Sequence, residues 1–313
     1  MKHYFIINPI AGRNDSTEYI TQEVERIFEN RKEEYVVYIT HKICDATDYV
    51  SKICMENEKS ESPEDIVFYA CGGDGSCFEV LNGLAGYKHA LFTVVPVGSC
   101  NDFLKSFPEY DFSNLEDLVN GVEKQIDIIK INEYYSLNVC NIGFDSKVNY
   151  DCVANRKKYK TIKQAYNAAI IKNILKPWND KVEIAMDSKV IFKGKLLLSA
   201  FANGNYYGGG YHCAPLAKVD DGLIDACIIK KVSRITFASL IKYFKDGTLL
   251  NKKQAKNIVT YKKGRKISIT SDKTLTVTID GESFFWKNID INVVTKGLRF
   301  ILPNKKIEKQ VNC

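Results

Sequence analysis

The sequence of 313 residues lacks the features that identify several common classes of protein. None of its ten cysteines forms a Cys-x-x-Cys pair and no signal peptide is visible, so we expect reduced thiols in a cytoplasmic protein. The longest apolar run, Leu196–Ala202, is much shorter than the roughly 20 residues of a membrane-spanning helix. The sequence therefore predicts a soluble protein, with peripheral attachment to the inner face of a membrane left open.

The histidines and the charges exclude further classes. The four histidines are not at spacings typical of metal ligands, and no Ser-His-Asp or Cys-His set supports nucleophilic catalysis. With 44 basic and 38 acidic residues, the net charge of +6 is mild and scattered. No tract combines basic and aromatic residues as nucleic-acid-binding modules do, so we predict no nucleic-acid partner.

The central feature that is present is an apolar run followed by a glycine-rich turn. Ile66–Ala70 is typical of a strand that is buried on both faces, and a helical pattern begins near Glu79. Glycine permits a close approach of the backbone, and a helix N-terminus attracts phosphate. In the intervening Gly72-Gly73-Asp74-Gly75, the carboxylate of Asp74 fits a phosphate site if a divalent metal ion lies between them. The alternative is a tight turn with an incidental Asp, since the stretch is neither a Walker A loop nor a Gly-x-Gly-x-x-Gly fingerprint.

Strands and helices alternate over the first part of the chain. This pattern predicts a Rossmann-like α/β nucleotide-binding domain with a parallel sheet over residues 1–125. Asn8–Arg13 and Gly98–Asp102 also follow strands, so we expect both to gather with Gly72–Ser76 at one edge of the sheet. The expected strands are Tyr4–Ile7, Tyr35–Ile39, Asp65–Ala70 and Ala90–Val95. The expected helices are Thr17–Asn30, capped by Asp15 or Ser16, and a second helix that Asp45 caps and that ends at Met55.

From about Lys124 the strand-like segments dominate. We predict a β-rich, mostly antiparallel domain over residues 126–302, followed by a polar tail at 303–313. Two helices are expected within it, one over Thr161–Leu175 and one over Ile235–Asp246 with Ser233 as its cap.

Three turns of this second domain carry candidate functional groups. Asn203–Tyr211 contains three consecutive glycines and is either a flexible hairpin tip or a functional loop. Asp220-Asp221-Gly222 fits a type I turn or a Mg²⁺ or Ca²⁺ loop. Asp280-Gly281-Glu282 follows a strand with alternating apolar residues, and it fits a solvated turn or a general base with a second carboxylate.

These motifs, in their order and approximate spacing, resemble those of the diacylglycerol kinase/sphingosine kinase superfamily and, within it, the soluble bacterial-type lipid kinases. The resemblance extends from about Lys2 to Leu302. It implies an NAD kinase/diacylglycerol kinase-like fold, with ATP and the acceptor lipid meeting in a cleft between two domains. The motifs are Asn8-Pro9 with Gly12, Gly72-Gly73-Asp74-Gly75, Pro96-x-Gly98-Ser99-x-Asn101-Asp102-Phe103, Asn203-Gly204 with Tyr207-Gly208-Gly209-Gly210, Asp220-Asp221-Gly222 and Asp280-Gly281-Glu282.

The resemblance also implies roles for single residues. Glu282 would accept the proton of the lipid hydroxyl with Asp280 beside it, and Asp74 would face the phosphates and their Mg²⁺. A structural Mg²⁺ would be bound by the Asp221 carboxylate and by carbonyls of Lys218 and Leu223. The residues implied to hold the nucleotide are Asn8, Pro9, Ile10, Ala11, Gly12, Thr40, Gly73, Asp74, Gly75, Ser76, Cys77, Phe78, Glu79 and Ser99.

The sequence departs from the family pattern at a few of these positions. Ser76 and Ser99 replace the usual Thr, and Cys77 and Phe78 stand where Leu or Ile and Asn are frequent. A polar-to-Phe change next to the nucleotide could alter contacts with its base or ribose, but no carboxylate that the chemistry needs is lost. Asp127 looks like the acidic residue that the family has at its domain junction.

The resemblance therefore implies an ATP- and Mg²⁺-dependent kinase that phosphorylates a hydroxyl of a lipid, such as diacylglycerol, at a membrane surface. One alternative is a kinase for a soluble acceptor such as NAD, which the turns at Asp220–Gly222 and Asp280–Glu282 disfavour. The other is a non-catalytic nucleotide-binding regulator, which the intact carboxylates disfavour. The identity of the lipid and the formation of a homodimer stay open.

Overall fold

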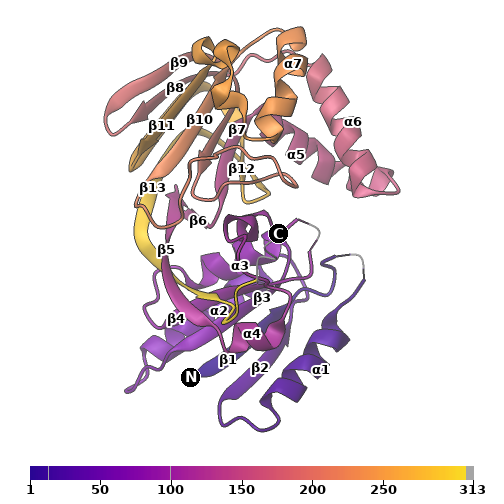
Figure 1. The fold of residues 1–313 in the computed structure, drawn as a ribbon, viewed down its shortest axis with the longest axis vertical. Helices are drawn as coiled ribbons and strands as arrows, with labels where there is room; N and C mark the ends of the chain where they lie inside the picture. The colour runs from indigo at the N-terminus through magenta and orange to yellow at the C-terminus, as the bar shows by residue number, and fades with distance from the viewer. Residues whose placement is uncertain (13, 99, 308–313) are drawn as a thin grey trace, which may run out of the picture. The chain divides into compact units, whose positions relative to one another are not determined.

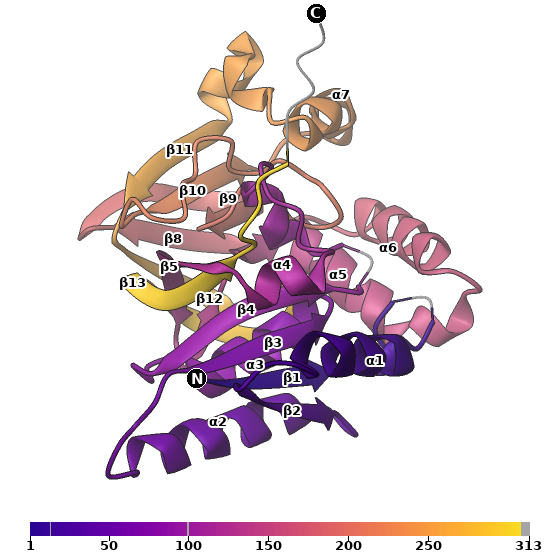
Figure 2. The same cartoon turned by 60° about the horizontal axis from the view of Figure 1, so that its bottom comes forward.

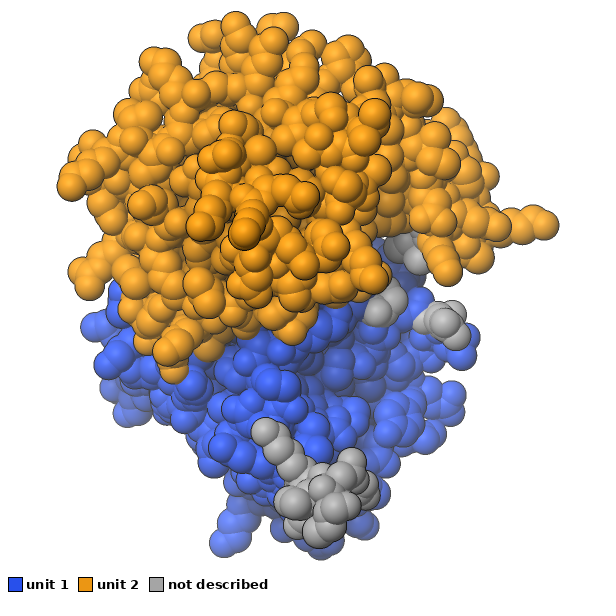
Figure 3. Space-filling model, turned by 45° about the horizontal axis from the view of Figure 1, so that its top comes forward, with its two compact units in different colours: residues 1–128, 295–313 blue, residues 129–294 orange. Residues whose placement is uncertain are grey.

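The computed structural model describes residues 1–12, 14–98 and 100–307. Contacts divide the chain into two units, which Figure 3 colours blue and orange. Unit 1 comprises Met1–Ile128 and Thr295–Cys313, and unit 2 comprises Ile129–Val294. The expected α/β amino-terminal part and β-rich carboxyl-terminal part are both present. In the part of the chain that is described, no helix has the length and apolar character needed to cross a membrane.

Unit 1 contains parallel strands in the order β2–β1–β3–β4, with helices on both faces (Figures 1 and 2). Every residue of β3 is buried, which explains its uninterrupted apolar run. The strands are β1 (Lys2–Ile7), β2 (Glu34–Ile39), β3 (Ile66–Gly72), β4 (Ala90–Pro96) and the first part of β5 (Val122–Ile131). The helices are α1 (Thr17–Phe28), α2 (Asp45–Glu58), α3 (Asp74–Leu84), α4 (Leu115–Val119) and the 3-10 helix η1 (Asp102–Ser106).

The chain returns to unit 1 through the end of strand β13 (Glu282–Leu302). Arg299 and Phe300 pair in parallel with Leu91 and Phe92 of β4. Residues 295–302, which the sequence analysis assigns to the second domain, therefore group with the first unit. The ring of Phe300 supports this placement by contacting four rings of unit 1, those of Phe92, Phe103, Phe107 and Phe112.

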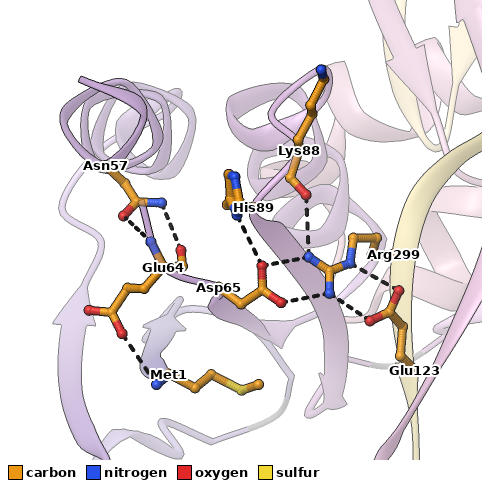
Figure 4. Close-up of polar contacts among 8 residues, drawn as sticks. All are labelled: Met1, Asn57, Glu64, Asp65, Lys88, His89, Glu123 and Arg299. Carbon is orange, nitrogen blue, oxygen red and sulfur yellow. Dashed lines mark hydrogen bonds and ion pairs between the residues drawn. The ribbon is translucent and has the colours of Figure 1, made fainter. Parts of the chain in front are cut away.

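A cluster of ion pairs holds the returning strand near the amino ends of β3 and β4 (Figure 4). The Arg299 guanidinium donates to both carboxylate oxygens of Asp65, each at 2.7 Å, and to Glu123 at 2.7 Å. Hydrogen bonds to these two carboxylates raise the pKa of Arg299. His89, just before β4, also contacts Asp65. The cluster therefore braces the sheet at the edge opposite the glycine-rich turns.

Unit 2 is a mainly antiparallel sheet with three α-helices. The strands pair in the order β11–β10–β9–β7–β12–β13, and β8 pairs with both β9 and β12. The strands are β6 (Tyr134–Ser136), β7 (Val139–Gly143), β8 (Lys181–Met186), β9 (Lys189–Ala202), β10 (Ile224–Lys230), β11 (Val259–Gly264), β12 (Lys266–Ile279) and the first part of β13. The helices are α5 (Phe144–Ala154), α6 (Ile162–Leu175), α7 (Arg234–Lys245), and the short η2 (Arg156–Lys158), η3 (Leu249–Asn251) and η4 (Lys253–Asn257).

An aromatic core joins α5 and α7 to the segment after α6. The rings of Phe144, Trp178 and Phe237 contact one another edge to face, with centroids 5.1, 5.4 and 5.7 Å apart. A capping box at Thr161 opens α6, and the Ser233 side chain accepts a hydrogen bond in the first turn of α7. The two helices that the sequence predicts are therefore present and begin at or next to the predicted positions.

Three element predictions differ from the structure. Asp45 is the first residue of α2 and not its cap, because Cys44 occupies the cap position with a left-handed φ of 65°. Helix α5 is absent from the predictions because its residues have almost no amphipathic periodicity. Strands β12 and β13 run through stretches that the sequence analysis treats as breaks, since cross-strand pairing continues on both sides of an irregularity between Thr270 and Leu275.

Candidate functional site

The loops after β1, β3 and β4 meet at the carboxyl edge of the unit 1 sheet. The side chain of Asn8, after β1, donates to Ser76 Oγ at 3.1 Å. The N–H of Asn8 donates to the carbonyl of Cys71 at 3.1 Å, and the N–H of Gly98 donates to the carbonyl of Gly72 at 3.0 Å. The structure thus brings the three motif segments together, as their positions after parallel strands lead one to expect.

Glycine is required at this edge because the backbones approach closely. A Cβ on Gly98 would lie 2.4 Å from the Cα of Gly73. A Cβ on Gly12, whose φ is 84°, would lie 2.3 Å from the carbonyl oxygen of Val97. The cap residue of α3 is Gly73, which has no side chain to occupy the N–H groups of the first turn. This geometry leaves a helix N-terminus suited to a phosphate group.

Two carboxylates and a thiol gather beside this helix N-terminus. The ligand atoms of Asp74, Cys100 and Asp102 all lie within 4.8 Å of one another. The N–H of Asp102 donates to Asp74 Oδ1 at 3.1 Å, and the largely buried Asp102 carboxylate forms an ion pair with Lys105. Carboxylate oxygens are the donors that Mg²⁺ prefers, so Asp74 and Asp102 fit a magnesium ion, whereas the softer thiol of Cys100 does not serve as a ligand for it. The sequence analysis quotes Asp102 in a motif but gives it no role.

Asn101 supplies a further polar group that sequence reasoning missed. Its side chain is buried, yet neither its amide oxygen nor its amide nitrogen has a hydrogen-bond partner among the described residues. Its Oδ1 lies near the close approach of Gly73 and Gly98, within 3.1 Å of where a Gly98 Cβ would stand. An unsatisfied buried amide is costly in the absence of a ligand, so its presence favours a polar ligand at this edge. The only sequence feature that pointed to Asn101 was its position in the motif after β4.

The other residues that the resemblance assigns to the nucleotide lie in several environments. Asn8–Gly12 is a turn at the same edge, and the N–H of Thr40 donates to the carbonyl of Ile7 at 2.9 Å. Glu79 is committed to α2, because its carboxylate accepts the N–H groups of Cys44 and Ala46 at 3.0 and 3.2 Å. Ser99 lies outside the described residues. The side chains that are largely buried are those of Ser76, Cys77 and Phe78.

Asp127 is buried within unit 1 and fixes a turn. Its carboxylate accepts the N–H of Lys296 at 2.7 Å, where Lys296 has a left-handed φ of 51°. The acidic residue that looked like a family feature at the domain junction therefore has a local structural partner in β13.

In unit 2, the carboxylate of Asp280 is a backbone anchor. It accepts the hydroxyl of Ser136 at 2.8 Å and the N–H groups of Leu137 at 2.7 Å and Val139 at 2.9 Å. Burial raises the pKa of Asp280, while these hydrogen bonds lower it. Asp280 therefore ties the β12–β13 turn to the turn before β7.

Glu282 is the first residue of β13 and is exposed. The turn before it is braced from α5, because the Asn149 side chain donates to the carbonyl of Gly281 at 2.7 Å. Gly281 has a φ of 99°, which glycine adopts without strain. The fold thus presents the Glu282 carboxylate from a turn that is anchored on both sides, by Asp280 and by Asn149.

The Asp220–Gly222 turn is held by a lysine. The Asp221 carboxylate accepts the N–H of Leu223 at 3.1 Å and an ion pair from Lys263 at 3.0 Å. The same ammonium lies 3.1 Å from the fully buried carboxylate of Asp225. The carboxylates of Asp221 and Asp225 share the single ammonium of Lys263, which leaves net negative charge. The turn also offers hard oxygen donors, so the donor set fits a divalent cation. Lys218, also assigned to this site, is exposed.

The glycine-rich loop after β9 is ordered by its surroundings. Gly208, Gly209 and Gly210 all have positive φ, which explains the three consecutive glycines. Tyr207 in this loop donates its hydroxyl to the carboxylate of the half-buried Asp145 at 2.8 Å. Burial raises the pKa of Asp145 to about 6. No sequence pattern points to Asp145, because only the fold places it next to Tyr207.

Comparisons with known proteins agree with this architecture. The family model for the diacylglycerol kinase catalytic domain matches residues 2–131, and that for the YegS C-terminal NAD kinase beta sandwich-like domain matches residues 138–301. The chain belongs to the bacterial diacylglycerol kinase family of lipid kinases. It is therefore a kinase with an alcohol group as acceptor.

The relatives cover nearly the whole chain at low identity. A diacylglycerol kinase of Bacillus subtilis is 26% identical over 308 residues, which is 97% of each chain. A crystal structure of a diacylglycerol kinase from Bacillus anthracis matches 96% of each chain with a TM-score of 0.67 and 23% identity. A yeast NADH kinase complexed with NADH matches with a TM-score of 0.54 and 12% identity, covering 99% of this chain and 84% of the yeast chain. At these identities the two structures show a shared fold.

Proposed function

We propose that the protein transfers the γ-phosphate of ATP to a hydroxyl group of a lipid such as diacylglycerol. The observation that carries the proposal is the set of groups at the carboxyl edge of unit 1. Asp74 and Asp102 lie next to an open helix N-terminus, and the amide of Asn101 has no partner among the described residues. Such a set suits a nucleotide phosphate and its magnesium ion.

In this proposal each group of unit 1 has a distinct task. The first turn of α3 donates N–H groups to the phosphates, and the Asn8–Gly12 turn holds the nucleotide near them. Asp74 and Asp102 hold the Mg²⁺, which neutralises charge on the phosphates when it is bound. Asn101 donates its amide to a phosphate oxygen, so that the amide becomes satisfied only in the complex.

The residues around the β12–β13 turn serve the acceptor. Glu282 accepts the proton of the lipid hydroxyl as that oxygen attacks the γ-phosphate. Asp280 is a positioning residue in this scheme, because its carboxylate is occupied by the backbone at Leu137 and Val139. In the turn at Lys218–Leu223, we propose that Asp221 and the carbonyls of Lys218 and Leu223 bind a structural Mg²⁺, with Lys263 as a second cation.

A soluble acceptor is the second candidate. The shared fold of the yeast NADH kinase favours it, although the likeness concerns fold alone. The lipid kinase and the soluble-acceptor kinase would use the same nucleotide-binding residues of unit 1 and would differ only in the acceptor. For a lipid acceptor we propose a place in phospholipid metabolism, at the cytoplasmic face of a membrane.

An assay of ATP consumption with a panel of acceptors tests the proposal. The panel contains diacylglycerol, a long-chain base, phosphatidylglycerol, a polyprenol and NAD. We expect phosphate transfer to a lipid and none to NAD, and we expect Asp74→Asn to reduce transfer by at least about 100-fold, because the metal loses a ligand. Transfer to NAD alone, or no transfer to any acceptor, would contradict the proposed function.

A further inference from the structure

One corner of unit 2 joins the carboxyl end of α6 to the amino end of α7. The guanidinium of Arg234, the first residue of α7, donates to the carbonyl oxygens of Ile174 at 2.7 Å and Leu175 at 3.2 Å. These bonds fill carbonyl groups that the end of α6 leaves open. Figure 1 shows the two helices next to each other. We call this region the α6–α7 corner. It comprises Ile171–Lys176 at the end of α6, Arg234 and Ile235 at the start of α7, and the lysines of the groove next to Ser233.

Three large apolar side chains at this corner face solvent. Ile171 is 62% exposed and Leu175 is 72% exposed, and they lie one turn apart on the same face of α6. Ile235, in the first turn of α7, is 84% exposed. The opposite face of α6 is already packed, with Ala165 and Ala169 buried in the core of unit 2. Exposed apolar side chains that gather in this way mark an interaction surface.

Lysines flank the same corner. A shallow groove that leads to Ser233, the cap of α7, is lined by Lys193, Lys195, Lys230 and Lys231. Lys193 forms an ion pair with Glu183. Neither Lys195 nor Lys230 has an acidic partner in the described ranges, so the groove carries an excess of positive charge.

The α6 side of the corner has the same sign of charge. Lys172 and Lys176 both pair with Asp151, at 2.6 and 3.0 Å, which leaves one positive charge in excess. The remaining acid nearby, Asp180, pairs with Lys147. Exposed apolar side chains flanked by more lysines than acidic residues therefore form the outer surface of this corner.

We propose that the α6–α7 corner is a membrane-docking surface and that its partner is a bilayer with anionic headgroups. Ile171, Leu175 and Ile235 enter the boundary between headgroups and acyl chains, and the flanking lysines contact headgroup phosphates. Charge complementarity selects an anionic bilayer over a second copy of this chain, because a symmetric contact would bring the lysines of two copies together. The proposal rests on the proposed function, since a diacylglycerol acceptor resides in a bilayer.

Co-sedimentation with vesicles tests this surface. The full chain is mixed with phosphatidylcholine vesicles that contain or lack phosphatidylglycerol, at low and at high salt. We expect binding to the anionic vesicles and a large loss of that binding at high salt, because salt screens the lysines. We expect at least about tenfold weaker binding for Leu175→Asp/Ile235→Asp and for Lys195→Glu/Lys230→Glu.

The matched control is Ile43→Asp/Met55→Asp, with Ile43 before α2 and Met55 within it, which adds the same two negative charges at exposed apolar positions, 86% and 44% exposed. It should bind vesicles as the unchanged protein does, and thermal unfolding should show that every variant is folded. Wild-type binding by both corner variants would overturn the proposal. So would sedimentation velocity in which Leu175→Asp/Ile235→Asp separates a dimer while its vesicle binding is unchanged.

A dispersed short-chain diacylglycerol separates this inference from the proposed function. Loss of vesicle binding together with unchanged turnover of the short-chain acceptor supports the docking surface. Absence of turnover with every acceptor, in a wild-type protein whose vesicle binding still depends on the corner, contradicts the proposed function and leaves the docking surface supported.

Discussion

Asn101 is held in a conformation and an environment that both cost stability. Its φ is 45°, in the left-handed region, and its buried amide finds no hydrogen-bond partner among the described residues. Asparagine tolerates this backbone better than most residues, but glycine tolerates it best. Such a residue is expected where a ligand completes the hydrogen bonds that folding leaves open.

We therefore predict that Asn101→Gly keeps or raises the melting temperature while it weakens ATP binding by at least about tenfold, because one hydrogen bond to a charged group is lost. Thermal unfolding and calorimetric titration with ATP and Mg²⁺ measure the two effects. The control is Asn132→Gly in unit 2, at a similar φ of 49°, which should leave ATP binding unchanged. A strong fall in melting temperature with unchanged ATP affinity would show that Asn101 is purely structural.

Asp145 gives a prediction about pH. Burial raises its pKa from 3.8 to about 6, so between these values the folded protein holds a proton that the unfolded chain has released. The contribution of this group to stability therefore increases as pH falls from about 6 towards 4, by up to about 3 kcal/mol.

Asp145→Asn removes this dependence because an amide does not titrate, although its NH₂ group would face the N–H of Ser146 or the side-chain amide of Asn141, which both donate to the carboxylate of Asp145. Denaturant unfolding of both proteins between pH 4 and pH 7 measures it. We expect the stability of the variant relative to the unchanged protein to be highest at pH 7 and to decrease as the pH falls. The same difference in stability at every pH would mean that the carboxyl of Asp145 does not titrate in this range.

At the scale of elements, the β12–β13 hairpin separates two carboxylates that are neighbours in sequence. Asp280 is turned towards backbone N–H groups, whereas Glu282 begins the next strand and is exposed. The Asp280 carboxylate stabilises the turn, and we propose that the exposed Glu282 carboxylate serves the chemistry. The sequence alone could not distinguish the two carboxylates, because the difference depends on which one faces the backbone N–H groups and which one faces solvent in the folded hairpin.

We predict that Asp280→Asn lowers the free energy of unfolding by about 3 kcal/mol, because an amide N–H would face backbone donors that the carboxylate now satisfies. Glu282→Gln should change stability little, since its side chain is at the surface. Urea unfolding of both variants makes the comparison. Equal stability of Asp280→Asn and the unchanged protein would show that the anchor is unimportant.

How much of the fold the sequence predicts depends on the kind of signal. Helices α6 and α7 have side-chain caps at Thr161 and Ser233, so their starts are local and predictable. Helix α5 has no such signal: its cap is Gly143, at φ 112°, and its apolar residues follow no regular period. The return of the chain to unit 1 at Phe300 depends on aromatic packing between distant segments, which no local pattern contains.

The candidate site also has a part that the sequence predicts and a part that it does not. The segments Asn8–Gly12, Gly72–Ser76 and Gly98–Asp102 could be placed at one edge because parallel strands end there. The sequence could not predict that the amide of Asn101 is unsatisfied, or which groups bind the side chains of Glu79 and Asp280. Each of these features depends on which group lies nearby in the folded chain.

At the scale of the whole molecule, the two units carry different sets of candidate groups. Unit 1 has the donors and carboxylates that suit a nucleotide with its metal, and unit 2 has an exposed carboxylate on an anchored turn. The two matched domain models cover both units. We propose that the two sets serve one reaction, phosphate transfer to a lipid hydroxyl.

Transfer of labelled γ-phosphate from ATP to diacylglycerol by Glu282→Gln, measured in a single turnover beside the unchanged protein, tests that claim most directly. We expect unchanged ATP binding and transfer that is at least about 100-fold slower, because the acceptor loses its proton acceptor while the nucleotide groups of unit 1 are intact. Transfer by Glu282→Gln at the rate of the unchanged protein would contradict the account.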